Sequence, residues 1–288
     1  MGQSYAICMD TGADIPWRTV QLHQLLVAHL HYTIHDVSHT YDLGREADLA
    51  SLYFSMRNGT AIATAPVRVE EFCALWEPML ALGRDILYLA VSAQLSETFQ
   101  NAQQARKEML TRYPVRRIVL VDTQACSIAQ GMLLYEAAQM QKEGQTLDHV
   151  ADWVVQNRAY VHFLLLPVSL RGLREAGFVR GGAIKELLSR RMAVRLNEKG
   201  HIERDGGFSN TGDALDAMVD YAAHHGYALG TQTVSVVHTD EAELAADLRQ
   251  KLFKETGCAD VAVLPMNPFA GCHVLPGAVG LAFFGSRR

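Results

Sequence analysis

Short runs of β-forming residues alternate with helix-favouring segments through the first half of the chain, and the connections between them are short. Strands are expected near 5–9, 30–34, 86–91 and 118–121, and helices near 19–27, 47–56, 69–82, 100–111 and 127–143. This alternation favours a parallel sheet that is covered by helices on both faces.

The pattern changes after a helix expected at 147–157. Strands are expected at 161–166, 234–238 and 261–264. The segments 193–196 and 202–204, separated by Asn197-Glu198-Lys199-Gly200, predict a hairpin, and a hairpin implies a mixed sheet. The sequence therefore predicts two α/β domains, residues 1–157 with a mainly parallel sheet and residues 158–288 with a mixed sheet.

Composition excludes several classes of protein. With 288 residues, 49% of them hydrophobic, the chain can bury a large core, yet no apolar run approaches the roughly 20 residues that span a bilayer. The first residues lead into a strand rather than a signal peptide, which favours a cytoplasmic protein without stable membrane insertion. The five cysteines form no C-x-x-C pair, so neither a disulfide framework nor a cysteine zinc site is indicated. A net charge of −5 without a basic stripe argues against a nucleic-acid partner.

Several hydroxyl side chains lie between the strand expected at 86–91 and the helix expected at 100–111. They are Ser92, Ser96 and Thr98. The carboxyl end of a strand is the usual ligand side of an open α/β sheet, and a helix amino terminus there offers unpaired N–H donors to an anion. Ser and Thr are also ordinary helix caps, and the segment taken by itself favours this capping role over a ligand site.

Five segments, in order along the chain, carry a family resemblance. They are 9–16 with Asp10, Thr11 and Asp14; 63–66 with Thr64; 92–102; 121–131 with Asp122, Ser127 and Gly131; and 271–281 with His273 and Gly277. They resemble signatures of the DegV family of bacterial fatty-acid-binding proteins, including Thr-Ser-Gln-Pro, Ser-x-x-Leu-Ser-Gly-Thr-Tyr-Gln-x-Ala and Gly-x-His-x-Gly-Pro-Gly-Ala-x-Gly-Leu. The resemblance extends over nearly the whole chain.

The resemblance implies both a layout and a function. It implies a three-layer α/β first domain, a mixed-sheet α/β second domain, and one long-chain fatty acid enclosed between them by a non-catalytic carrier. In the family, hydroxyls and a late histidine hold the carboxylate, and on this chain these are Thr64, Ser96 and His273. Ser92 and Thr98 are expected to support the site. Asp10, Thr11, Asp122 and Gly277 are expected to shape its loops, with the aspartates bonding backbone N–H groups.

Further expectations from the resemblance concern partners and cofactors. The bound acid can be presented to a separate ATP-dependent fatty-acid kinase, which makes an acyl-phosphate. No cofactor or metal is expected besides the fatty acid itself.

The chain also departs from the family signatures. Glu97 and Leu275 replace glycines, and Ala63 and Ala65 replace Thr and Gln. The signature Lys-x-Gly-Gly-Arg-Ile corresponds to residues 174–179 and has Phe178 in place of Arg, while Lys-Pro-Ile corresponds to Arg191-Met192-Ala193. An inward Glu97 would favour a neutral or cationic amphiphile, whereas an outward Glu97 would suit the helix dipole. The departures therefore indicate a divergent member of the family, whose ligand or partner can differ from those of the other members.

Other function classes remain alternatives. Ser96, His273 and Asp122 could form the nucleophile, base and orienting acid of a hydrolase or acyl-transfer enzyme, although no Gly-x-Ser-x-Gly elbow is present. The histidines at 23, 29, 31, 35 and 39 lack the further ligands that would complete a metal site. No dinucleotide or Walker motif follows the first strand.

Overall fold

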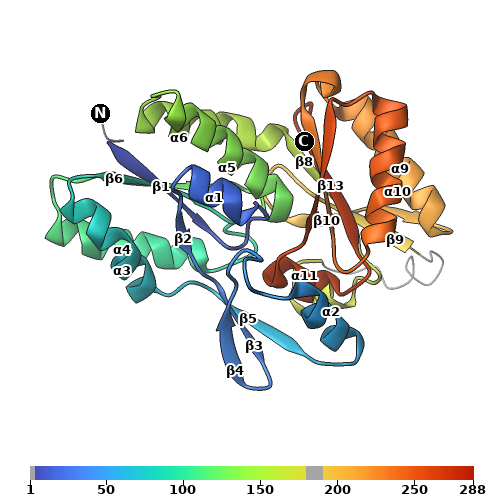
Figure 1. Cartoon of the computed structure of the whole chain (residues 1–288), viewed down its shortest axis with the longest axis horizontal. Helices are drawn as coiled ribbons and strands as arrows, with labels where there is room; N and C mark the ends of the chain where they lie inside the picture. The colour runs from blue at the N-terminus through green and yellow to red at the C-terminus, as the bar shows by residue number, and fades with distance from the viewer. Residues whose placement is uncertain (1–3, 180–190) are drawn as a thin grey trace. The chain divides into compact units, whose positions relative to one another are not determined.

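The computed structural model describes residues 4–179 and 191–288 (Figure 1). Its first sheet is parallel throughout, with the strand order β2-β1-β6-β7. The strands are β1 Tyr5–Asp10, β2 Leu26–Ala28, β6 Asp85–Ala90 and β7 Ile118–Asp122. Every residue of β1 is buried, as expected for a central parallel strand covered on both faces.

Helices cover this sheet in two layers. The helices of this part are α1 Trp17–Leu22, α3 Val69–Ala81, α4 Thr98–Arg112, α5 Ser127–Lys142 and α6 Leu147–Asn157. Alternate residues of β1, such as Ile7 and Met9, join a core cluster with residues of α5 and α6. On the other face Trp76 of α3 donates to Cys8 Sγ at 3.4 Å and packs against Tyr88. The predicted α/β class with a parallel sheet is confirmed.

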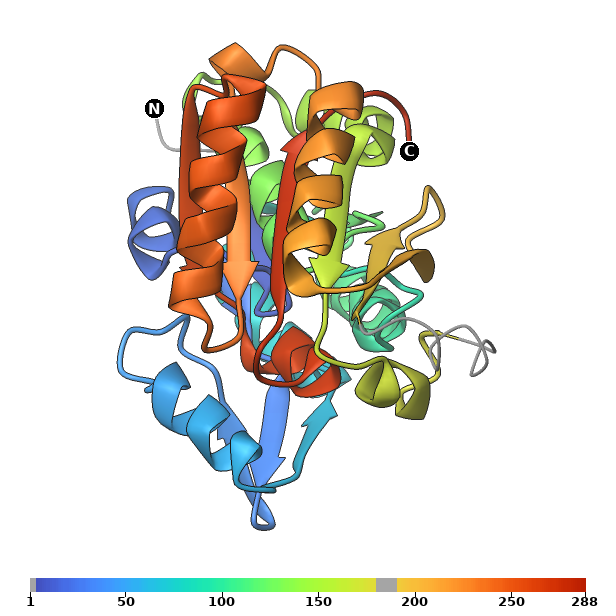
Figure 2. The same ribbon diagram turned by 90° about the vertical axis from the view of Figure 1, so that its right-hand side faces the viewer.

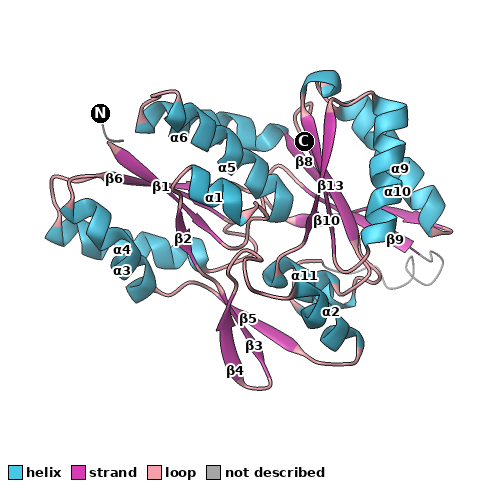
Figure 3. Ribbon diagram, in the orientation of Figure 1, coloured by secondary structure: helices cyan, strands magenta, loops and turns pink. Residues whose placement is uncertain are grey.

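A small second sheet has the order β4-β3-β5, and two predictions for this part of the chain are corrected. Its strands are β3 His31–Ile34, β4 Val37–Thr40 and β5 Ile62–Ala65 (Figure 3). The predicted strand at 30–34 exists, but it pairs with β4 in a hairpin and not with the parallel sheet. The helix predicted at 19–27 ends at Leu22, because Gln24 has a φ of 52° and β2 pairs with β1 instead.

The six-stranded sheet of the second half is mixed and has the order β10-β9-β8-β13-β11-β12. Its strands are β8 Val161–Leu166, β9 Arg191–Leu196, β10 Ile202–Phe208, β11 Thr233–His238, β12 Asp260–Pro265 and β13 Val279–Phe284. The β9–β10 pair is antiparallel, so the predicted hairpin and mixed sheet are confirmed. The strand β13 is not among the predicted elements, and it pairs antiparallel with both β8 and β11.

Helices α9 Thr211–His225 and α10 Ala242–Thr256 cover one face of the mixed sheet (Figure 2). The shorter helical segments are α2 Leu49–Arg57, α7 Arg171–Glu175, α11 Pro268–Val274 and the 3₁₀ turns Arg158–Tyr160 and Leu229–Thr231. Across residues 4–179 and 191–288, no helix combines the length and apolar character needed to cross a membrane.

The chain divides into two compact units. The first contains the residues up to Ala47 together with Ala63–Arg158, and the second contains Asp48–Ile62 together with Ala159–Arg288. The division predicted from sequence, residues 1–157 and 158–288, assigns Asp48–Ile62 to the first domain, whereas this segment belongs to the second unit. We call this segment the excursion. This excursion carries α2, which bonds to Asp240 and Met266 of the same unit.

Candidate functional site

The hydroxyl side chains that follow β6 form a local hydrogen-bonded turn in the first unit. Ser92 is fully buried, and its hydroxyl accepts a hydrogen bond from the Gln94 N–H at 3.3 Å. The hydroxyl oxygens of Ser96 and Thr98 lie 2.8 Å apart, and Ser96 Oγ also accepts from the Thr98 N–H at 3.2 Å. Ser96, one position before the N-cap residue Glu97, therefore satisfies the first N–H of α4 while it remains partly exposed.

Thr98 joins this turn to the segment that follows β5. Its hydroxyl accepts from the Val67 N–H at 3.3 Å, and Asn101 of the same helix donates to the Val67 carbonyl at 2.8 Å. Thr64, a partly buried residue of β5, lies three positions before Val67. The first unit thus ties the Thr64 segment to the Ser96 segment through the buried Thr98, which acts as a structural support.

Glu97 lies at the start of α4 with an exposed side chain that makes no capping hydrogen bond. Its φ of −73° and ψ of −4° are ordinary helical values, so this backbone does not require glycine. The structure matches the outward orientation, in which Glu97 lies near the positive end of the helix dipole.

Two aspartates accept hydrogen bonds that order the loops after β1 and β7. Asp10 is fully buried and accepts from Gly12 N at 3.0 Å, Val91 N at 2.8 Å, Tyr88 OH at 2.7 Å and Gln130 Nε2 at 3.3 Å. Burial raises the pKa of Asp10, and these hydrogen bonds oppose the rise. Asp122 accepts from Ala93 N at 3.3 Å and Gln124 N at 2.9 Å, and so supports the turn that carries Ser92. Thr11 accepts from Leu30 N at 3.0 Å.

The helix α11, in the second unit, carries His273 and is fixed by close contacts. Asn267 caps its start by accepting from the N–H groups of residues 269 and 270 at 3.0 Å each. Tyr53 of α2 donates to the Met266 carbonyl at 2.7 Å. A Cβ on Gly271 would lie 2.0 Å from the Tyr53 hydroxyl oxygen, and a Cβ on Gly172 would lie 2.3 Å from the His273 carbonyl oxygen. Only glycine permits either approach.

The His273 ring lies partly buried beside Phe178. The ring centroids are 5.1 Å apart and the planes meet at 80°, an edge-to-face contact. Burial lowers the pKa of His273 below its ordinary value, so the imidazole is neutral at pH 7 and has one N–H to donate. Phe178 contributes no charge here, where the resembling signature would place an arginine.

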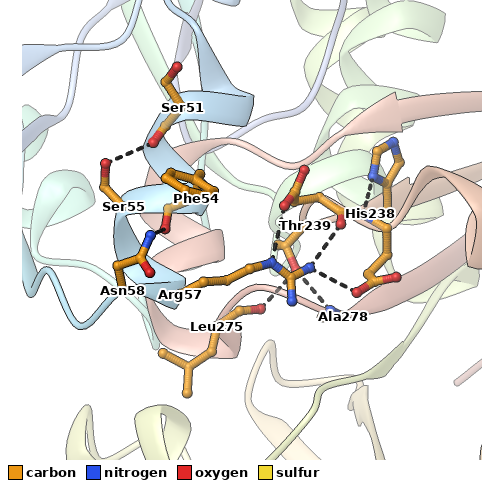
Figure 4. Close-up of polar contacts among 11 residues, drawn as sticks. Ser51, Phe54, Ser55, Arg57, Asn58, His238, Thr239, Leu275 and Ala278 are labelled. Atoms are coloured by element: carbon orange, nitrogen blue, oxygen red, sulfur yellow. Dashed lines mark hydrogen bonds and ion pairs between the residues drawn. The ribbon is translucent and has the colours of Figure 1, made fainter.

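The loop after α11 is held by Thr239, at the end of β11 (Figure 4). The buried Thr239 hydroxyl donates to the Leu275 carbonyl and accepts from the Ala278 N–H, both at 2.8 Å. Leu275 has a φ of 66° and Gly277 a φ of 105°. A Cβ on Gly277 would lie 2.5 Å from Val168 Cγ2, so Gly277 is needed both for its backbone angle and for its close packing.

The structure groups the predicted site residues within each unit. Thr64, Ser92, Ser96 and Thr98 belong to the first unit with Asp10, Thr11 and Asp122, and His273 and Gly277 belong to the second. Within residues 4–179 and 191–288, no three His, Cys, Asp or Glu side chains are grouped to hold a metal ion. His31 instead pairs with Glu71 at 2.8 Å, and His29 contacts the Tyr41 carbonyl.

Sequence reasoning missed Tyr53, Asn267 and Thr239, which hold the His273 helix and its loop. Asn267-Pro268 is a readable helix start, since Asn is a good N-cap and Pro is favoured at the next position. Tyr53 gave no such signal, because its partners lie more than 200 positions away along the chain.

Comparison with known proteins gives consistent matches over the whole chain. A family model described as an uncharacterised protein of the DegV family matches residues 4–286. A DegV domain-containing protein of Clostridium perfringens is 26% identical over 288 residues, with 99% of each chain covered.

Solved structures also match. A structure from Thermus thermophilus, titled for fatty-acid binding of a DegV family protein, has a TM-score of 0.84 at 22% identity and covers 98% of this chain and 99% of its own. A stearic-acid-binding protein of Eubacterium ventriosum has a TM-score of 0.87 at 16% identity and covers 98% of both chains. These similarities establish the fold.

Proposed function

We propose that this chain, which belongs to the DegV family, is a carrier that binds one long-chain fatty acid. The paired hydroxyls of Ser96 and Thr98, 2.8 Å apart and partly exposed at Ser96, carry the proposal because they offer a donor at the carboxyl end of a parallel strand. Two structural neighbours are named for binding a fatty acid or stearic acid. Thr64, Ser96 and His273 are proposed to hold the carboxylate.

The chemistry of these residues suits an acid headgroup. A carboxylate taken out of water needs hydrogen-bond donors, since an unpaired one costs several kcal/mol. Thr64 and Ser96 each supply a hydroxyl, and His273, kept neutral by burial, supplies one N–H. The acyl chain supplies most of the binding free energy, at about 0.8 kcal/mol for each buried methylene. The headgroup residues then select and orient the acid.

The carrier is proposed to act without catalysis of its own and to present its acid to a separate fatty-acid kinase in the cytoplasm. In the structure the Ser96 hydroxyl bonds to Thr98 rather than to a base, and Asp122 is occupied by backbone N–H groups. Both observations support a binding role for Ser96. The free state of all five cysteines suits a reducing compartment.

Native and denaturing mass spectra of the gently purified protein provide the first test. A stoichiometric long-chain acid released on denaturation is the expected result. A protein that is empty and also takes up no added oleate would overturn the proposal.

Headgroup variants provide the second test. Ser96→Ala and Thr64→Ala should each weaken oleate binding to the delipidated protein by about 1 to 3 kcal/mol, or roughly fivefold to 150-fold. Thr111→Ala is the matched control, because this exposed residue of α4 bonds only to the Lys107 carbonyl among the described residues. Unchanged affinity in both headgroup variants would refute the site, even if an acid is carried.

A further inference from the structure

Helix α2 contacts the region around His273 at two places within the second unit. At one end of α11, the Tyr53 hydroxyl lies 2.7 Å from the Met266 carbonyl oxygen and 3.2 Å from the Asn267 carbonyl oxygen. Tyr53 is almost fully buried, with 1% of its surface exposed. One face of α2 therefore fixes the start of α11, the helix that carries His273.

The second contact lies one turn further along α2. Arg57 donates from Nε to Asp240 Oδ2 at 3.1 Å, and from Nη2 to the Asp240 carbonyl at 2.9 Å and to Glu241 Oε1 at 2.8 Å (Figure 4). Asp240 has a φ of 56°, so Arg57 holds a loop whose backbone is in an uncommon conformation. Tyr53 and Arg57 are four positions apart and lie on the same side of the helix.

Thr239 transmits the second contact to the other end of α11. It directly precedes Asp240, and its hydroxyl and backbone bond to the Leu275, Gly277 and Ala278 backbone. The two contacts of α2 thus bracket His273, with Tyr53 at the start of α11 and Arg57 acting through the loop that clamps its end. A single helix therefore supports α11 from both ends.

Tyr53 also explains a residue of the closing signature. A Cβ at Gly271 would lie 2.0 Å from its hydroxyl oxygen and 2.8 Å from its ring carbon Cε1. Gly271 is two positions before His273 in the same helix, so the tyrosine packs on the side of this turn that lies away from the imidazole and supports the turn from behind. Displacement of Tyr53 would leave a void against this turn.

We propose that Tyr53 and Arg57 are positioning residues for His273, and that the excursion Asp48–Ile62 sets the orientation of the imidazole that selects an acid headgroup. The inference rests on the proposed function for its ligand, an oxyanion on a long alkyl chain. The excursion leads directly into β5, so one continuous segment of the chain carries Tyr53, Arg57 and Thr64. Neither Tyr53 nor Arg57 is required to touch the ligand.

Nuclear magnetic resonance of the imidazole tests the positioning directly and needs no ligand. In Tyr53→Phe, the His273 ring resonances should shift and the His273 pKa should move toward its ordinary value, since a looser α11 admits water to the ring. Tyr160→Phe is the matched control, because it removes the same hydroxyl from an exposed tyrosine of the second unit. Unchanged His273 resonances and titration in Tyr53→Phe would overturn the inference.

A double-mutant cycle tests whether the effect passes through the imidazole. Tyr53→Phe should weaken binding of oleate by about threefold to tenfold, leave binding of oleyl alcohol within about twofold, and have no further effect in a His273→Ala background. Equal losses for acid and alcohol, or an undiminished loss without His273, would show a general structural role and overturn the inference.

Arg57→Lys is a second variant in the same assays. Lysine keeps the charge but cannot hold the Asp240 carboxylate, the Asp240 carbonyl and Glu241 with one rigid fork, so a smaller change in the same direction is expected. A wild-type protein that binds no fatty acid would sink the proposed function, while the His273 resonances would still decide the positioning role.

Discussion

Protonation of His162 should destabilise the second unit as the pH falls. This β8 residue is 1% exposed, its Nε2 lies 2.7 Å from the Ser286 carbonyl oxygen, and its Nδ1 lies 3.0 Å from the Tyr221 hydroxyl. The Nε2–H donates to the carbonyl and Nδ1 accepts from the tyrosine, so the neutral ring satisfies both contacts. The ring also stacks on Phe283 at a centroid distance of 4.9 Å.

The structure gives the sign and the size of this effect. Burial lowers the pKa of His162 from 6.5 to about 4, and the hydrogen bond to Ser286 only partly opposes the fall. Between these two values the unfolded chain binds more protons than the native one, so stability rises with pH. The stability that the neutral His162 contributes is complete above about pH 6.5 and is lost as the pH falls toward and through about 4. For this histidine alone the loss is about 2 kcal/mol at pH 5 and about 3 kcal/mol below pH 4.

Hydrogen exchange of peptides from β8 and β13, measured in urea at pH 7, 6 and 5 and corrected for intrinsic rates, reports on the second unit. Tryptophan fluorescence reports separately on the first unit, because all three tryptophans lie there. His162→Gln should reduce the loss of opening free energy between pH 7 and 5 by about 2 kcal/mol. His224→Gln, at an exposed position of α9, should retain the wild-type slope. A His162→Gln slope equal to that of the wild type would refute the reasoning.

Three further outcomes are expected. The free energy of unfolding should be about 1 kcal/mol higher for Leu275→Gly than for Leu275→Ala, because both variants lose the leucine side chain but only glycine relieves the strain of a φ of 66°. Urea unfolding of the two variants measures the difference, and equal free energies would show that the backbone at this position is not strained. Glu97→Gln should leave the dissociation constant of oleate within about twofold, since the side chain is exposed, whereas a large gain in affinity would place the charge near the ligand. Arg191→Met should raise the free energy of unfolding by about 1 kcal/mol, because Nε and Nη2 of Arg191 are buried without a hydrogen-bond partner in the described chain and burial lowers its pKa; a clear loss of stability in urea unfolding would contradict this.

Segments with a decisive local pattern were predictable from the sequence. The predicted helix 147–157 and strand 161–166 coincide with α6 and β8. Thr146 caps α6 by accepting from His149 N, and the apolar side of the helix packs on the sheet. β8 is a continuous apolar run buried along its whole length. In both, local propensity and tertiary packing favour the same structure.

Other elements depend on partners that a local pattern does not contain. The apolar residues of β2 extend a helical pattern as readily as they form a strand, and pairing with the edge of β1 decides between the two. β4 is exposed along its whole length, so no alternation of buried and exposed residues marks it. The assignment of α2 to the second unit likewise rests on contacts with residues near 240 and 266.

Many residues of the matched family signatures hold the backbone of this chain in place, and the departures can be compared with that structural role. Asp10, Asp122 and Thr98 bond the loops, while Gly131 and Gly271 leave room for the Asp14 carbonyl oxygen and the Tyr53 hydroxyl, which a Cβ would approach to 2.2 and 2.0 Å. The backbone around the hydroxyls and the imidazole requires these residues, because they bond it or leave room for its close contacts. The departures at Glu97 and Phe178 leave these loop contacts in place: one side chain is exposed, and the other changes the charge beside His273. The departures therefore leave the scaffold intact and change only side chains around it, at the exposed start of α4 and beside the His273 ring.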